Sequence, residues 1–332
     1  MNKSWPIKCY AMLIFCILIC ASCIIAIYVY HTLKTTANII YVPMQGDQDA
    51  LWELWPDLKM ENEKERMTST DIEEKDIKVA TPISVLLMGV DERTLDQGRS
   101  DTLILAVMNP NDKKILLLSI PRDTYVELAG LGYKDKINHA YAFGGTEMAI
   151  NTVEQFIGIP VDYYIQVNME GFVQLINVFD GVDVINDFSF EYEGYLFEEG
   201  ALHLDGQHAL KFSRMRYDDP RGDFGRNDRQ KKVIEALMKK GMENKFTFVQ
   251  SFPTMIDIAS QTVSTNIAPD EILSLYDDYA DSGYTFMTEE LRGSDRFRDA
   301  IYYYDVDDTE IHRVRKVIKD ILYLPILEEV TR

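Results

Sequence analysis

Three apolar segments of strand length follow one another in the first half of the chain. They read ISVLLMGV (83–90), TLILAVMN (102–109) and KILLLSI (114–120). Segments that stay apolar throughout, instead of alternating with polar residues, are typical of strands buried on both faces of a sheet. The turn-forming NPNDKK between the last two segments predicts that they form a β-hairpin. Both faces of such a sheet must be covered by other elements, which favours a layered α/β fold.

Helix and strand patterns alternate over the remainder of the chain. This alternation predicts an α–β–α sandwich with a mixed central sheet. We expect the core domain over 81–241, and we expect 242–332 either to pack on this core or to form a small separate domain. Residues 187–204 are acidic and read as a loop. The other expected elements are helices near 145–157, 169–179, 224–241, 246–260, 269–280 and 308–323, a helix that starts near Asp205, and strands near 161–167, 181–186, 284–288 and 300–305.

An uncharged segment lies near the N-terminus. Residues 9–30 read CYAMLIFCILICASCIIAIYVY, which is 22 residues without a charge. As a helix this segment is roughly 33 Å long, enough to cross a hydrocarbon core. It is longer than the apolar part of a cleavable signal peptide, and no A-x-A-like site follows it. We therefore expect one N-terminal transmembrane helix that remains as an anchor.

The flanking charges predict how this helix is oriented. Lys3 and Lys8 precede it, so residues 1–8 are expected in the cytoplasm and everything after Tyr30 outside the cell, on a Gram-positive-type bacterium. Residues 31–80 are dense in charge and read as an extracytoplasmic linker. All four cysteines lie within 9–30, so we expect neither a disulfide nor a cysteine metal site in the exported part.

Charge and missing motifs exclude several classes of function. The net charge is −20, which disfavours a nucleic-acid partner because phosphate backbones demand basic surfaces. The chain has no P-loop, no dinucleotide fingerprint, no G-x-S-x-G elbow and no H-E-x-x-H zinc motif. The common nucleotide-dependent, serine hydrolase and zinc peptidase sites are therefore excluded.

The loop GVDERTLDQGRSDT (89–102) carries carboxylates next to two strands. Asp91 follows the first apolar strand and Asp101 begins the second, so a hairpin-like loop brings both to one end of the sheet. Two carboxylates suit Mg²⁺, which takes one or two protein carboxylates together with water and ligand phosphates. The alternative is an ordinary solvated loop.

Residues 211–232 form a basic segment, KFSRMRYDDPRGDFGRNDRQKK. It contains eight Lys or Arg against four Asp. Arginine forks bind phosphate with two hydrogen bonds, and the DPRGD turn precedes a helix N-terminus, where anions are favoured. Arg214 and Arg216 are two residues apart, which suggests extended backbone there. The alternative is a solvated helix face with compensating salt bridges.

Arg122, in SIPRDTYV, follows the third apolar strand. A charged residue at the end of a central strand lies where open α/β sheets bind ligands. Together, Asp91, Asp101, Arg122 and the arginines of 211–232 predict a site for Mg²⁺ and a pyrophosphate. A surface position paired with Asp123 is the alternative for Arg122.

Five motifs in this order resemble the LytR-CpsA-Psr (LCP) proteins of Gram-positive cell envelopes. The motifs are GVDERTLDQGRSDT, SIPRDTYV, KINHAYAFGG, LDGQHALKFSRMR and DPRGDFGRNDRQ. The resemblance implies an α–β–α sandwich with an apolar groove for a lipid. It also implies a membrane-anchored phosphotransferase that moves an anionic glycopolymer, wall teichoic acid or capsular or secondary wall polysaccharide, from a polyprenyl-pyrophosphate carrier to peptidoglycan.

The same resemblance assigns roles to individual residues. It implies that Asp91 and Asp101 hold Mg²⁺ (or Mn²⁺) and that Asp91 helps to deprotonate the acceptor. The residues implied to bind pyrophosphate or glycan are Arg93, Arg99, Arg122, Arg214, Arg216, Asp223, Arg226 and Gln230. Two other functions remain open at this point: a polyprenyl-diphosphate phosphatase with water as acceptor, and a non-catalytic regulatory or attenuator protein of the envelope.

Overall fold

A six-stranded mixed sheet forms the centre of the molecule. The structure, a computed structural model, describes residues 41–43, 80–91, 98–243, 245–268, 271–280 and 283–325. The strand order is β11-β6-β1-β2-β3-β12. The strands are β1 (Ile83–Val90), β2 (Ser100–Asn109), β3 (Lys114–Ser119), β6 (Tyr163–Asn168), β11 (Val263–Thr265) and β12 (Thr285–Glu290). Antiparallel pairing of β2 with β3 confirms the predicted hairpin, and β1–β6 and β3–β12 are parallel.

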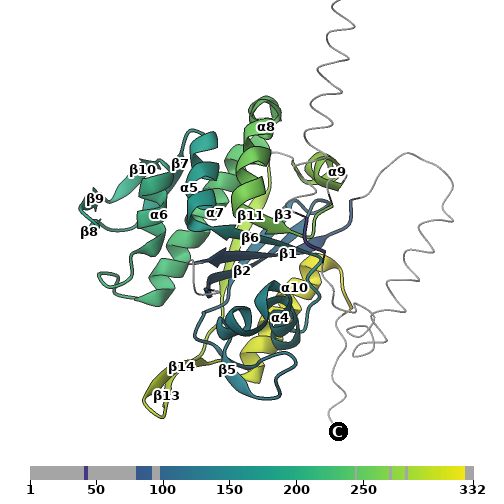
Figure 1. Cartoon of the computed structure of the whole chain (residues 1–332), viewed down its shortest axis with the longest axis vertical. Helices are drawn as coiled ribbons and strands as arrows, with labels where there is room; N and C mark the ends of the chain where they lie inside the picture. The colour runs from purple at the N-terminus through teal and green to yellow at the C-terminus, as the bar shows by residue number, and fades with distance from the viewer. Residues whose placement is uncertain are drawn as a thin grey trace, which may run out of the picture.

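Helices cover both faces of this sheet, as predicted (Figure 1). Leu86 and Met88 of β1 pack in one core cluster with α4 (His139–Ile157) and α10 (Asp308–Leu322). Val85, one residue out of phase, packs in a second cluster toward α7 (Asp223–Glu243) and α9 (Glu271–Tyr279). Alternate residues of one strand therefore bury opposite faces, which is why these strands are apolar throughout.

A second group of elements lies beside α7. It consists of α5 (Met169–Val178), α6 (Gly206–Arg214), β7 (Val182–Asn186), β8 (Phe190–Tyr192), β9 (Tyr195–Phe197) and β10 (Gly200–Leu204). The expectation of a loop at 187–204 is wrong, because this segment contains β8, β9 and β10. Apolar side chains of this segment are buried, among them Phe190 and Phe197 against Phe212 of α6, while the acidic residues between these two are exposed. β7 pairs with β10 and does not join the central sheet.

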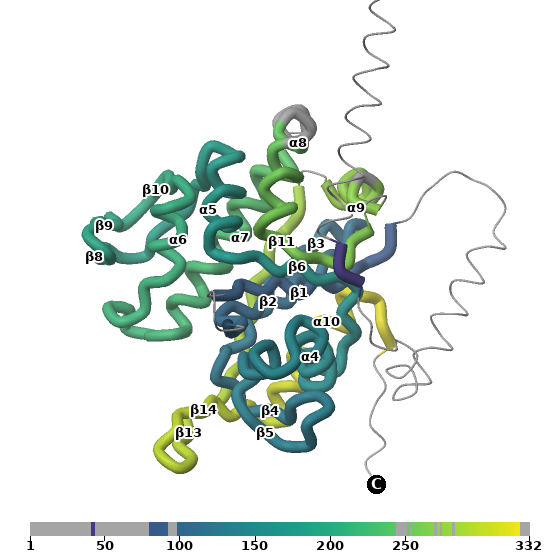
Figure 2. The backbone as a smooth tube through the Cα atoms, viewed as in Figure 1, coloured from purple at the N-terminus to yellow at the C-terminus, as the bar shows by residue number. Residues whose placement is uncertain are grey.

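The C-terminal segment completes the central sheet (Figure 2). β11 and β12 are its two outer strands, and α8 (Lys245–Thr262) and α10 occupy the positions predicted for helices. The prediction of a strand near 300–305 is confirmed by β14 (Ile301–Asp305), whereas the short strands β4 (Tyr125–Glu127), β5 (Lys134–Lys136) and β13 (Ser294–Arg298) were not predicted. The β13–β14 hairpin projects from the body of the molecule (Figure 1).

The predicted anchor, 9–30, and most of the linker, 44–79, lie outside the described residues. Within the part of the chain that the structure describes, no helix is both long enough and apolar enough to span a bilayer.

Candidate active site

The backbones of Asp91 and Asp101 lie close together at one end of the central strands β1 and β2. The backbone N–H groups of Asp91 and Asp101 both donate to the carbonyl oxygen of Arg99, at N···O distances of 3.4 and 3.1 Å. Gly98, with a φ of 72°, makes the left-handed turn that brings the chain back to β2. The side chain of Arg99 is exposed. Arg93 lies outside the described residues.

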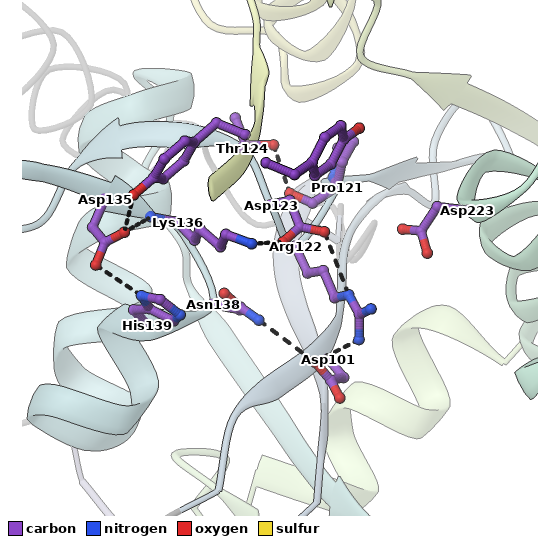
Figure 3. A network of polar contacts seen from close by, with 12 residues as sticks. Asp101, Pro121, Arg122, Asp123, Thr124, Asp135, Lys136, Asn138, His139 and Asp223 are labelled. Atoms are coloured by element: carbon purple, nitrogen blue, oxygen red, sulfur yellow. Dashed lines mark hydrogen bonds and ion pairs between the residues drawn. The ribbon is translucent and has the colours of Figure 1, made fainter. Parts of the chain in front are cut away.

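Arg122, which follows β3, forms an ion pair with Asp101 at the start of β2 (Figure 3). Its Nη1 is 3.0 Å from Asp101 Oδ1 and its Nε is 3.7 Å from Asp123 Oδ2. Asn138 Nδ2 approaches the same oxygen of Asp101 at 3.5 Å. Burial lowers the pKa of Arg122, but the carboxylates of Asp101, Asp223 and Asp123 outweigh it and raise the pKa above its usual value. Arg122 therefore stays charged beside three carboxylates.

Two further arginines share one carboxylate at the start of α7. Arg216 Nε lies 3.4 Å from Asp223 Oδ1, and Arg226 Nη2 lies 3.0 Å from Asp223 Oδ2. Burial lowers the pKa of Arg226; Asp223 raises it, and the charges of Arg122 and Arg216 lower it further. These mutual effects put the three arginines within electrostatic reach of one another. Among the described residues, the buried Nε of Arg226 has no hydrogen-bond partner, which leaves a donor for a bound anion.

A buried arginine fixes the turn that presents Arg216. Arg229 donates to the carbonyl oxygens of Phe212 and Met215 and forms a 2.5 Å ion pair with Asp219. Gly225 is needed here because a Cβ at this position would overlap the Asp219 carboxylate. Arg229 therefore ties α7 to the end of α6 and to the α6–α7 turn.

A small recess lies beside Arg216 and Asp223. It is lined by Pro121, Asp123, Arg216, Asp223, Phe224, Asn227, Tyr302 and Tyr304. The two tyrosines come from β14 and were not predicted as site residues. Tyr304 is buried, its hydroxyl donates to the carbonyl oxygen of Leu291, and burial raises its pKa to about 12. The signal that sequence reasoning missed is the alternation within YYYD (302–305), which puts these two tyrosines on one face of a strand.

Other residues of the basic segment have structural partners. Arg214 is the last residue of α6, so the expectation of extended backbone through this residue is wrong, although Met215 is extended. Arg214 pairs with Glu193 of the β8–β9 turn at 3.9 Å. Gln230 is half-buried on α7, one turn after Arg226. The solvated-face interpretation fits Arg221 and Lys232, which are paired with Asp228 and Asp187, respectively.

The donor set suits a hard divalent cation that also binds ligand oxygens. Asp91 and Asp101, whose backbones both bond Arg99, offer two carboxylates, and Mg²⁺ usually takes one or two from a protein. Within the described ranges there is no group of three or more His, Cys, Asp or Glu arranged to hold a metal. The fit is therefore to a cation that also binds the substrate, as Mg²⁺ does at phosphate sites.

Comparison with known proteins adds independent information. The model of the LytR_cpsA_psr family matches residues 56–320. The polyisoprenyl-teichoic acid–peptidoglycan teichoic acid transferase TagU of Bacillus subtilis strain 168 is 41% identical over 263 residues, which are 79% of this chain and 84% of TagU. The crystal structure of B. subtilis TagU is 38% identical with a TM-score of 0.61, over 75% of this chain and 100% of that one. A structure of TagT bound to LI-WTA is 28% identical with a TM-score of 0.63, over 76% of this chain and 95% of that one.

Proposed function

The chain belongs to the LytR-CpsA-Psr family, and we propose that it transfers an anionic glycopolymer from a polyprenyl-pyrophosphate carrier to peptidoglycan. The names of the relatives support this reaction, since TagU is a teichoic acid–peptidoglycan transferase and TagT is seen bound to LI-WTA. We take wall teichoic acid as the polymer to test first. The lipid would occupy an apolar groove of the domain.

One observation carries the proposal. Arg122, Arg216 and Arg226 come within electrostatic reach of one another from separate elements, the β3–β4 loop, the α6–α7 turn and α7, and Arg216 lines the recess together with Asp223. The carboxylates of Asp101, Asp123 and Asp223 raise the pKa of Arg122 and keep it charged. A pyrophosphate can accept hydrogen bonds from these clustered guanidinium groups. Phosphoryl transfer is the chemistry that such a site serves, because its catalysis consists mostly of positioning and charge neutralisation.

The reaction balances as a single displacement at phosphorus. The acceptor hydroxyl oxygen forms a bond to the phosphorus that carries the polymer, and the bridging P–O bond breaks. The electron pair of that bond leaves with polyprenyl phosphate, and the hydroxyl proton passes to a carboxylate, for which Asp91 is our candidate. The arginines remain protonated throughout and stabilise the charge that develops on the leaving phosphate.

Asp91 and Asp101 would hold Mg²⁺ or Mn²⁺, which would neutralise phosphate charge when bound. Arg99 and Arg93, on the same loop, and Gln230, one turn along α7, are assigned to the pyrophosphate or the first sugar. Arg214 is assigned to the outer part of the polymer, since it is exposed and its partner Glu193 is 3.9 Å away. Asp223 positions Arg216 and Arg226.

We also propose that residues 9–30 anchor the protein in the membrane with the catalytic domain outside the cell, where peptidoglycan lies. The length and composition of this segment support that placement. Protease treatment of intact protoplasts should then degrade the C-terminal domain and spare an N-terminal tag. Protection of the domain would contradict the orientation.

A defined transfer assay tests the function. Purified full-length chain in detergent is given a lipid-linked teichoic acid and peptidoglycan, and release of polyprenyl phosphate and polymer attachment are both measured. We expect attachment to depend on acceptor and to stop in Arg216→Ala, while Arg221→Ala, an exposed arginine paired outside the recess, remains active. Release of polyprenyl phosphate without acceptor, at the same rate, would identify a phosphatase instead. Polymer binding without turnover would indicate a regulatory protein.

A further inference from the structure

The β13–β14 hairpin has two chemically different faces. Residues directly opposite each other on an antiparallel ladder share a face, and the face alternates along each strand. The register pairs Asp295 with Tyr304 and Phe297 with Tyr302 on one face. The other face carries Arg296, opposite Tyr303, together with the pair Arg298 and Ile301.

The second face holds the hairpin against the domain. The Arg298 guanidinium stacks 4.0 Å from the ring centroid of Tyr125 on β4, and Tyr125 meets the Tyr303 ring edge-on at 5.0 Å. Arg298 also bonds both oxygens of Asp305 at 3.0 Å. The hydroxyl of Tyr303 donates to Asp135 at 3.2 Å. These contacts fix the direction in which the hairpin projects.

The first face continues outward from the recess. Tyr302 and Tyr304 line the recess, and the Tyr304 ring packs edge-on against Phe224 of α7 at 5.4 Å. Phe297 makes the next contact outward, with its ring centroid 5.7 Å from that of Tyr302. Phe297 is nevertheless 70% exposed. Phe297 and Tyr302 therefore present adjoining aromatic rings on one face of the hairpin, next to the recess.

The negative charge on this face favours a neutral ligand over an anionic one. Its polar groups are the exposed carboxylate of Asp295 and the hydroxyl of Tyr302, which donates to Asp295 at 2.8 Å. Burial, Asp295, Asp123 and Asp223 together raise the pKa of Tyr302. The nearby Lys136 is engaged with Asp123 at 2.6 Å. A polyphosphate chain would be repelled by Asp295, whereas a neutral sugar can stack on Phe297 and donate its hydroxyls to Asp295.

We infer that the outer face of the β13–β14 hairpin, formed by Asp295, Phe297 and Tyr302, binds the amino-sugar glycan of the acceptor. This inference rests on the proposed transferase function. Acceptor sugars on this face lead directly into the recess beside Arg216 and Asp223, where the pyrophosphate is bound. The hairpin therefore serves acceptor recognition, and the donor polymer leaves the site by another route.

Exposed residues on the two faces provide a matched test. Phe297→Ala and Ile301→Ala each remove an exposed apolar side chain from the same hairpin, 70% and 50% exposed, so neither variant should unfold the domain. Only Phe297 lies on the proposed surface. The full-length chain in detergent is assayed by calorimetry for binding of a soluble N-acetylhexosamine glycan strand without peptides and, separately, of free glycerol-phosphate polymer. The transfer assay then gives KM for acceptor and for donor.

We expect Phe297→Ala to weaken glycan binding and raise the acceptor KM by about tenfold, the scale of one aromatic contact, without changing the donor KM. Ile301→Ala should match the wild type in both measurements. Unchanged glycan affinity in Phe297→Ala, or a loss that affects the glycerol-phosphate polymer equally, would overturn the inference. If glycan binding depends on Phe297 but no lipid-linked polymer is transferred, the surface is correct and the proposed function fails. If transfer proceeds with an unchanged acceptor KM in Phe297→Ala, the function holds and the surface is wrong.

Discussion

The guanidinium of Arg122 lies 3.0 Å from the carboxylate of Asp101, and this pair joins the end of β3 to the start of β2. The contact orients the Arg122 guanidinium at the end of these central strands, and the Asp101 side chain remains partly exposed to solvent. Arg122 Nε is directed toward Asp123, which is itself held by Lys136. The Arg122 side chain is thus positioned from two sides before substrate binds.

Replacing Arg122 should therefore reduce transfer more than it reduces stability. We expect Arg122→Ala to lower kcat/KM by about a hundredfold or more, the usual effect of removing a charged group that stabilises the transition state. Arg122→Lys should retain part of the activity, because it keeps the charge and loses the two-pronged geometry. Steady-state transfer rates measure the effect, and thermal melts by circular dichroism establish that the variants are folded. Equal rates for Arg122→Ala and the control Arg221→Ala would remove Arg122 from the site.

The carboxylate of Asp223 neutralises charge on Arg216 and Arg226. A variant without it should therefore gain stability when an anion binds in its place. In Asp223→Ala the buried Arg226 loses its 3.0 Å partner, at a cost of roughly 3 kcal/mol. Inorganic pyrophosphate should bind in place of the carboxylate and raise the melting temperature of this variant more than that of the wild type.

The matched control for this experiment is Asp218→Ala, because Asp218 is exposed in the same turn. It should melt like the wild type and show the wild-type response to pyrophosphate. An Asp223→Ala variant with wild-type stability and no added response would show that Arg226 does not depend on this carboxylate.

The sheet was the most predictable part of this molecule, and the reason is physical. The three segments at 83–120 are buried on both faces, so their composition alone indicates their environment. Residues 187–204 were harder to interpret, because their strands are only three to five residues long and acidic residues stand between apolar ones such as Phe190 and Phe197. The high content of acidic residues led to the prediction of a loop, although apolar and polar residues alternate in this segment.

The sequence predicted that the site contains arginines and aspartates, but it did not predict every residue that lines it. Arg226 and Arg229 lie three residues apart on one helix, yet Arg226 pairs with Asp223, which lines the recess, and Arg229 pairs with Asp219. That difference arises from the α6–α7 turn, which no local pattern in α7 reveals. Tyr302 and Tyr304 reach the recess from a hairpin far along the chain, so only tertiary structure brings them there.

Arg229 and Asp219 should therefore be important for stability. Asp219→Ala leaves a buried guanidinium without its partner and should lower the free energy of unfolding by about 3–5 kcal/mol. Arg221→Ala removes an exposed ion pair with Asp228 and should cost less than about 1 kcal/mol. Urea unfolding followed by circular dichroism compares them. If both variants unfold at the wild-type urea concentration, the α6–α7 turn is held by other contacts.

Glu154 on α4 should make the free energy of unfolding depend on pH between about 4.5 and 7. Its Oε1 accepts a 2.7 Å hydrogen bond from the Val161 N–H. Burial raises its pKa to about 7; the Val161 bond opposes that shift and Asp162 adds to it. The folded protein therefore holds a proton on Glu154 that the unfolded chain, with a pKa of about 4.5, has already lost. The stabilisation from this group is complete below pH 4.5 and is lost as the pH rises to 7.

Glu154→Gln removes this dependence because glutamine keeps the acceptor for Val161 and carries no charge. The variant should match the wild type near pH 4.5 and exceed it above pH 7 by up to about 3 kcal/mol, since each pKa unit corresponds to about 1.4 kcal/mol. Glu147→Gln, on the exposed side of the same helix, is the control and should follow the wild-type curve. Urea unfolding between pH 4.5 and 8.5 gives the three curves. Parallel curves for Glu154→Gln and the wild type would mean that Glu154 is already ionised in the folded protein at acidic pH.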